Sequence, residues 1–179
     1  YRSAAWKIRG VDEPLEGMLN SGNKSLYAYR FDWDDHRKFF IADFKKLIGA
    51  AHATEIPLLA GNEKLVGGYP LSDFIYPAGK SKFYMSKNMM NFWSNFAKNG
   101  YPGSSTNSIE WKSYNEDSSF MILDSKNNLK MYSDNNSFKN LSMQLFEDER
   151  VNDLEKCVIL LQMFAFVGND IYDENIGHY

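Results

Sequence analysis

A single histidine, His52, lies in a stretch of small residues that also carries a carboxylate three positions later, Glu55. Small neighbours let a backbone approach other groups closely, as a catalytic imidazole requires when it must reach a nucleophile on a neighbouring loop. A strand-like run over residues 25–33 lies upstream, so a strand and a loop are predicted to lead into the histidine. The sequence contains no Gly-x-Ser-x-Gly, the motif that exposes a serine nucleophile, so it offers a base without its serine.

Polar side chains at the end of the strand-like run suggest a metal site as an alternative. They are Asp32, Asp34, Asp35 and His36, to which His52 and Glu55 could be added. Zinc sites favour histidine and cysteine at tight spacing, and calcium loops need more oxygen ligands at regular spacing. We therefore expect no metal or other cofactor, and interpret the acidic group as the solvated end of a strand.

Composition limits the remaining classes of protein. With 179 residues, 44% of them hydrophobic, the chain is long enough for one domain with a core. The net charge is −3 and the lysines are dispersed, which disfavours nucleic acid and anionic lipid as partners. The single cysteine, Cys157, opens an apolar helical run, and we expect it to be a buried, inert thiol. That run, residues 157–167, is too short to span a bilayer, which takes about 20 helical residues.

Breaker residues and periodicity predict the elements of the first part of the chain. Residues 3–9 are expected to end a helix at Gly10, and residues 13–20 to form a second helix with Asp12 as its N-cap. The run 25–33 alternates as a strand with one aromatic face, made by Tyr27, Tyr29, Phe31 and Trp33.

The second part contains the clearest helix, residues 82–99, with Ser81 as candidate N-cap and a stop at Gly100. A loop rich in glycine and proline is predicted before it, over residues 61–81. Residues 119–124 and 129–133 are predicted to form a hairpin, and a final helix is expected at about 150–167. The helix at 82–99 carries an apolar stripe that indicates core packing: Met85, Met89, Trp93, Phe96 and Ala97.

Five segments, in order along the chain, resemble the type-B carboxylesterase/cholinesterase family, most closely its bacterial members. They are residues 6–14 (WKIRGVDEP), 27–34 (YAYRFDWD), 49–57 (GAAHATEIP), 89–102 (MMNFWSNFAKNGYP) and 111–114 (WKSY). The resemblance implies an α/β fold, the C-terminal part of an α/β hydrolase, with residues 1–179 as one segment of a single domain. Because the chain opens at Tyr1 without a methionine or a signal peptide, we expect it to have been cut from a longer protein.

The resemblance also implies a reaction and a role for one residue. The family cleaves carboxylic esters through a serine acyl-enzyme, and His52 lies where its catalytic histidine takes the serine proton and passes it to the alcohol. Glu55 matches a carboxylate often found near that histidine, where we expect a buried hydrogen-bond partner. The serine and the triad acid would lie upstream, so the isolated chain is predicted to be inactive.

Two departures from the family pattern occur near the histidine. Ala53 replaces the usual glycine, and Leu58 replaces an aromatic residue that is common just past the proline. Alanine costs little unless its backbone needs a positive φ. We therefore expect the histidine to remain functional.

Two other functions remain open. The same family includes members that lost the triad and act as binding or adhesion modules, although these have no need to keep the histidine. The other is the metal-dependent protein considered above. The expected partners are an ester substrate, the missing N-terminal portion and further copies of the chain, which an unpaired strand 25–33 or the helix 82–99 would contact.

Overall fold

The computed structural model describes residues 1–62, 64, 67–115, 117–134 and 136–165. The chain divides into two compact units. The sheet unit, Tyr27–Ser133, contains the strands, and the helical unit combines Tyr1–Leu26 with Asp134–Tyr179. His52 and the acidic group after the predicted strand all belong to the sheet unit.

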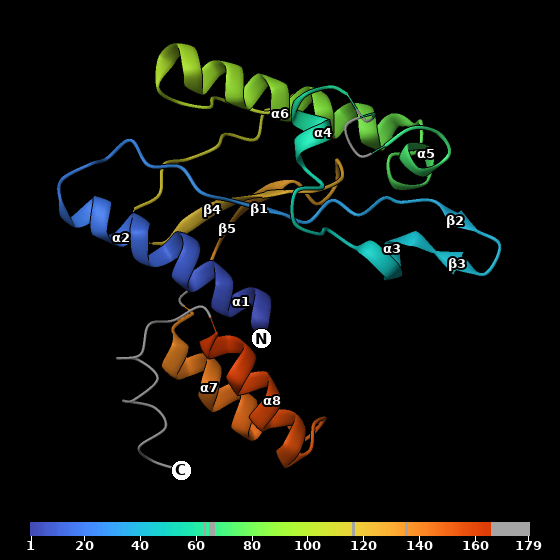
Figure 1. Ribbon diagram of the computed structural model, residues 1–179. Helices are drawn as coiled ribbons and strands as arrows, with labels where there is room; N and C mark the ends of the chain where they lie inside the picture. The colour runs from blue at the N-terminus through green and yellow to red at the C-terminus, as the bar shows by residue number, and fades with distance from the viewer. Residues whose placement is uncertain (63, 65–66, 116, 135, 166–179) are drawn as a thin grey trace. The chain divides into compact units, whose positions relative to one another are not determined.

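A three-stranded sheet in the order β1-β4-β5 forms the centre of the sheet unit (Figure 1). β1 (Tyr29–Phe31) runs parallel to β4 (Ser119–Leu123), and β4 pairs antiparallel with β5 (Lys130–Ser133). In the parallel pair, Tyr29 lies opposite Met121. The predicted hairpin is therefore confirmed.

β1 is much shorter than the predicted strand 25–33. The N–H groups of Asp32 and Trp33 both donate to the carbonyl oxygen of Leu123, at 2.9 and 3.1 Å. Since an extended strand turns successive residues to opposite sides, two consecutive donors to one carbonyl end the regular ladder directly after Phe31. Among the described residues, no strand pairs with the other edge of β1.

The predicted aromatic face around β1 packs against other parts of the sheet unit. Tyr29 contacts the rings of Trp93 and Trp111 edge-on, with centroids 5.1 and 6.2 Å apart. Trp33 is fully buried, and Tyr27 and Phe31 pack against the same core. This face therefore packs against the chain's own side chains, although Tyr29 keeps 36% of its surface exposed.

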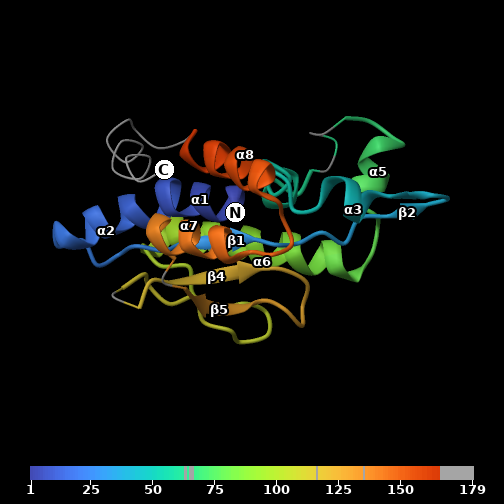
Figure 2. The ribbon, with the colours of Figure 1, turned by 90° about the horizontal axis from the view of Figure 1, so that it is seen from below.

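Helix α6 (Lys80–Asn99) lies over the sheet, as the two views in Figures 1 and 2 agree. It ends at Gly100, whose φ of 75° is the left-handed geometry predicted for this stop. Its N-cap residue is Gly79 instead of Ser81, because the Ser81 hydroxyl donates to Asp35. The predicted core stripe is confirmed at Met85 and Met89, which are buried, and at Trp93, which packs against the core. It is wrong at Phe96 and Ala97, which are exposed, while Phe92 is buried instead.

The remaining elements of the sheet unit are short. They are β2 (Lys38–Phe39), β3 (Ala42–Asp43), α3 (Phe44–Ile48), α4 (Ile56–Leu59) and α5 (Leu71–Ile75). The predicted loop over residues 61–81 is wrong at α5, and its positions 63, 65 and 66 lie outside the described residues. α5 begins directly after Pro70, whose fixed φ suits the start of a helix, so a turn residue marks a helix here.

The helical unit opens with one continuous helical stretch. It comprises α1 (Arg2–Lys7), the π-helix η1 (Ile8–Asp12) and α2 (Glu13–Asn20). The predicted stop at Gly10 is wrong, because Gly10 lies inside η1, where a Cβ would sit 3.4 Å from the Trp6 ring. Asp12 precedes α2 but makes no capping bond; its carboxylate pairs with Lys7 at 2.8 Å instead.

Two C-terminal helices complete the helical unit. α7 (Phe138–Glu147) is a helix that the sequence analysis missed, although Ser137 caps it by accepting from the Asn140 N–H. α8 (Asp153–Phe164) lies within the predicted final helix, of which residues 166 and 167 are outside the described part. Among the described helices, none is long and apolar enough to cross a membrane.

Cys157 contradicts its prediction, because it is exposed on α8. The buried residues of that helix are Met163 and Phe164, and Ile159 and Leu160 are partly buried against the cluster formed with α1 and α7. Cys157 is not among these residues, so the apolar run does not bury it.

Candidate active site

His52 lies on a tight turn between α3 and α4 (Figure 1). Thr54 closes the turn, since its N–H and its hydroxyl both donate to the carbonyl oxygen of Ala51, at 3.1 and 2.6 Å. The His52 side chain is exposed, as an imidazole must be to act on a group on another segment. The predicted loop around His52 is confirmed, but helix α3 and not a strand leads into it, and the catalytic role of His52 stays a prediction.

Ala53 has a left-handed backbone, with φ of 67°. A residue with a Cβ adopts this conformation at a cost of roughly 1–2 kcal/mol, whereas glycine adopts it freely. The condition under which alanine is costly is therefore met directly beside His52. The second departure, Leu58, is buried in the core of the sheet unit and replaces an aromatic ring by aliphatic packing.

Two hydroxyl groups anchor the segment that follows His52. The Tyr76 hydroxyl donates to the carbonyl oxygen of Thr54 at 2.8 Å, and the Ser86 hydroxyl donates to that of Leu58 at 2.6 Å. Ser86 belongs to α6, so the loop is tied to the longest helix of the unit. Burial raises the pKa of Tyr76 to about 12, and the charge of Glu55 adds to this effect, so the phenol keeps the proton that it donates.

Glu55 is half-buried at the start of α4. Among the described residues, no hydrogen bond reaches its carboxylate, so the expected role as a buried hydrogen-bond partner is wrong for this part of the chain. Its influence is electrostatic instead. Burial first, and then the Glu55 charge, raise the pKa values of Tyr29 and Tyr76.

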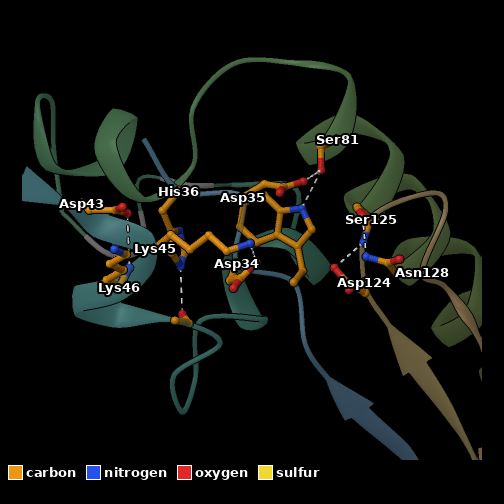
Figure 3. Close-up of polar contacts among 12 residues, drawn as sticks. Asp34, Asp35, His36, Asp43, Lys45, Lys46, Ser81, Asp124, Ser125 and Asn128 are labelled. Atoms are coloured by element: carbon orange, nitrogen blue, oxygen red, sulfur yellow. Dashed lines mark hydrogen bonds and ion pairs between the residues drawn. The ribbon is translucent and has the colours of Figure 1, made fainter. Parts of the chain in front are cut away.

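The acidic group after β1 is engaged by other side chains of the protein. Asp32 accepts from the guanidinium of Arg30 at 2.8 Å. Asp34 pairs with the Lys45 ammonium at 2.8 Å, and Asp35 accepts from the Ser81 hydroxyl (Figure 3). Within the described ranges, no three histidine, cysteine or carboxylate side chains gather closely enough to hold a metal ion.

Lys45 is the cation at the centre of this acidic group. Its hydrogen bond with Asp34 raises the pKa of the ammonium, and the charges of Asp35 and Asp124 add to the effect. Burial, together with the negative charges nearby, raises the pKa of Asp124, while hydrogen bonds with Ser125 and Asn128 oppose the rise (Figure 3). Lys45 therefore stays charged and ties α3 to the segment that follows β1.

His36 differs from its acidic neighbours because it is buried, with 9% of its surface exposed. Its Nδ1 lies 2.6 Å from the carbonyl oxygen of Ile75, and its Nε2 lies 2.8 Å from that of Gly49. The interpretation as part of a solvated strand end is thus wrong for His36. The ring connects the segment after β1 to α5 and to the residue that opens the His52 loop.

Sequence reasoning missed the groups that support the loop. Tyr76 and Ser86 lie 22 and 28 residues from the carbonyl groups that they bind. No local spacing links such distant partners, so only the folded chain reveals them. His36 was considered as a metal ligand and interpreted as part of a solvated strand end, because its carbonyl partners carry no side-chain signal.

The sheet unit is a mixed α/β structure that presents an exposed histidine on a loop, where catalytic residues are commonly found. A model of the carboxylesterase family matches residues 11–144, a span that includes His52. The chain belongs to the carboxylesterase family. This membership fits an α/β-hydrolase fold and suggests ester hydrolysis as the activity. No curated protein sequence matches the chain.

Proposed function

We propose that the chain is the C-terminal portion of a serine carboxylesterase and supplies the general base, His52. In this mechanism the imidazole takes the proton of a serine hydroxyl as the serine oxygen attacks the ester carbonyl. His52 then gives the proton to the departing alcohol, which leaves an acyl-enzyme. Water, activated by the same imidazole, attacks the acyl-enzyme and releases the carboxylic acid.

The observation that carries the proposal is the position of His52 within the family match. The imidazole is exposed on a turn, and the segment that follows it is anchored by the hydroxyl groups of Tyr76 and Ser86. A general base needs this combination, because it must be accessible to the nucleophile and fixed within hydrogen-bond reach of it.

The serine and the triad acid are proposed to lie upstream in the same protein. The sequence of 179 residues has no Gly-x-Ser-x-Gly, so another segment must present the nucleophile. By this proposal the partners of the chain are its own N-terminal portion and a carboxylic ester. The bacterial character rests on the resemblance of the five sequence segments.

The test is the replacement His52→Ala in the full-length protein. Loss of the general base should lower kcat for a short-chain nitrophenyl ester by roughly 10³–10⁶, the effect of removing a triad member. Lys38→Ala, which truncates an exposed side chain on β2, is the matched control and should leave kcat unchanged. A full-length His52→Ala protein with near-normal kcat would show that His52 is misassigned and would favour a binding module of the same fold.

A further inference from the structure

Both ring nitrogens of His36 lie within hydrogen-bond distance of backbone carbonyl oxygens. Both partners, the carbonyl oxygens of Ile75 and Gly49, can only accept. A neutral imidazole carries one N–H, so it can satisfy only one of them and turns a lone pair towards the other. The imidazolium carries two N–H groups and satisfies both.

The positions of these carbonyl groups connect His36 to the candidate active site. Gly49 is the residue at which α3 ends, with φ of 59°, and it opens the loop three positions before His52. Ile75 is the last residue of α5, and the next residue, Tyr76, binds Thr54 on the other side of His52. The end of α5 thus holds both sides of the His52 loop, one side through His36 and the other through Tyr76.

Ring packing adds to the two hydrogen bonds of His36. Trp33 meets the imidazole edge-on, with ring centroids 5.5 Å apart and an interplanar angle of 87°. The ring is therefore fixed in place by packing as well as by its two hydrogen bonds.

We propose that His36 is a positioning residue for His52, and that it acts as a buried imidazolium that clamps Gly49 to the end of α5. The proposal rests on the proposed function, because the positioned group is the general base. Its effect on catalysis follows from geometry: a displacement of about 1 Å in a catalytic group can cost about 10²-fold in rate. His36 itself touches neither the ester nor the nucleophile.

Nuclear magnetic resonance of the full-length protein with ¹⁵N-labelled histidine tests the protonation state. Both ring nitrogens of His36 should give the signals of protonated nitrogens at neutral pH, assigned by their loss in His36→Gln. A His36 with one unprotonated ring nitrogen would overturn the proposal. This readout does not depend on esterase activity, so it stands even if the proposed function fails.

Two variants test the clamp itself. His36→Leu, which has no donor, should lower kcat roughly 10–100-fold with little change in KM and should speed amide hydrogen exchange in residues 49–55. His36→Gln, which keeps an N–H donor, should show smaller changes in both measurements. Arg37→Gln is the control: it removes the neighbouring surface ion pair with Asp73 and should change neither.

The outcomes separate the two proposals. If His52→Ala abolishes hydrolysis while His36→Leu and His36→Gln keep normal kcat and normal exchange, His36 has no positioning role. If His52→Ala leaves hydrolysis intact, the proposed function fails, and the exchange of residues 49–55 still reports whether His36 holds the loop. Should His36→Leu not fold, His36→Gln and the wild-type resonances decide.

Discussion

Ala53 carries backbone strain directly beside the candidate base. Its φ of 67° belongs to the region that glycine adopts without cost. Strain at such a position persists only where the surrounding structure enforces it. Here the next residue, Thr54, is fixed because it donates to Ala51 and accepts from Tyr76. The conformation that orients His52 is therefore maintained against the preference of the residue that follows it.

At the residue scale, Ala53→Gly is expected to stabilise the protein. Removing the left-handed strain gains roughly 1–2 kcal/mol, and the added freedom of glycine in the unfolded chain takes back about 0.5–1 kcal/mol. The net gain, up to about 1.5 kcal/mol, can be measured by urea unfolding of the full-length protein. Ala51→Gly is the matched control, because Ala51 has no positive φ and glycine there should destabilise the protein. Equal effects of the two changes would show that Ala53 is not strained.

The residue types in the sequence identified His52 as the candidate base, but they did not identify the residues that hold its loop. The small residues and Pro57 predicted a loop around the histidine, and the structure has a turn there. The sequence alone shows that Ala53 would be strained if its φ were positive. Whether φ is positive depends on where the chain must turn, which the sequence does not show. The two bonds of His36 involve backbone carbonyls, which every residue carries, so no sequence pattern marks them.

At the scale of elements, the short helix α5 has a larger role than its five residues suggest. Its last residue and the one after it, Ile75 and Tyr76, provide the partners that hold the His52 loop. Its sequence has too few positions for helical periodicity, and its flanking glycine and proline residues are typical of a loop. By contrast, α6 has twenty residues of helical periodicity and could be predicted almost to its ends.

In β1 and α8, the sequence pattern predicted a longer strand and more burial than the structure has. The alternation over residues 25–33 correctly indicated one aromatic face, but only three residues keep the ladder because the partner strand β4 sets its length. In α8, apolar composition suggested burial of Cys157, whereas burial depends on which stripe faces α1 and α7. Local sequence predicts the type of an element better than its partners.

Tyr76→Phe tests the anchor at the end of α5. The change leaves the buried carbonyl oxygen of Thr54 without its donor and should destabilise the protein by about 1–3 kcal/mol. It should also loosen the His52 loop, seen as faster amide exchange in residues 51–55. Ser118→Ala is a suitable control, because its hydroxyl accepts from a different tyrosine, Tyr114, away from this loop.

The same phenol predicts a pH dependence. The folded structure raises the pKa of Tyr76 from 10.0 to about 12, so folding favours the protonated phenol. Its contribution to stability is fully present below pH 10 and is lost as the pH rises towards 12. The free energy of unfolding should therefore fall more steeply over this range in the wild type than in Tyr76→Phe. Parallel curves for the two proteins would contradict the assigned cause.

At the scale of the whole molecule, the 179 residues contain the proposed base, His52, but no Gly-x-Ser-x-Gly motif. Hydrolysis by the proposed mechanism needs a serine within reach of His52 and donors that stabilise the oxyanion. We therefore expect the isolated chain to show no esterase activity on a short-chain nitrophenyl ester. Hydrolysis by this chain that disappears in His52→Ala would show that it contains its own nucleophile.

The open edge of β1 leads to the last prediction, which concerns association. Among the described residues, β1 has a strand partner on one side only, and an unpaired edge is a template for another strand. The aromatic face of residues 27–33 packs against the core of the sheet unit, whereas the backbone groups at the edge of β1 remain available. The edge, and not the aromatic face, is therefore the expected contact. We expect the isolated chain to self-associate through this edge, with light scattering showing a mass that grows with concentration.

A pair of substitutions at one position can identify the edge as the contact. Ala28 and Asp32 use their backbone groups towards β4, so by alternation the N–H of Tyr29 points to the open edge. Tyr29→Pro removes that N–H together with the aromatic ring, whereas Tyr29→Ala removes only the ring. Association should weaken in Tyr29→Pro and persist in Tyr29→Ala. Equal association of both variants would exclude the edge as the contact, and a wild-type chain that stays monomeric would show that the edge of β1 is not a template in solution.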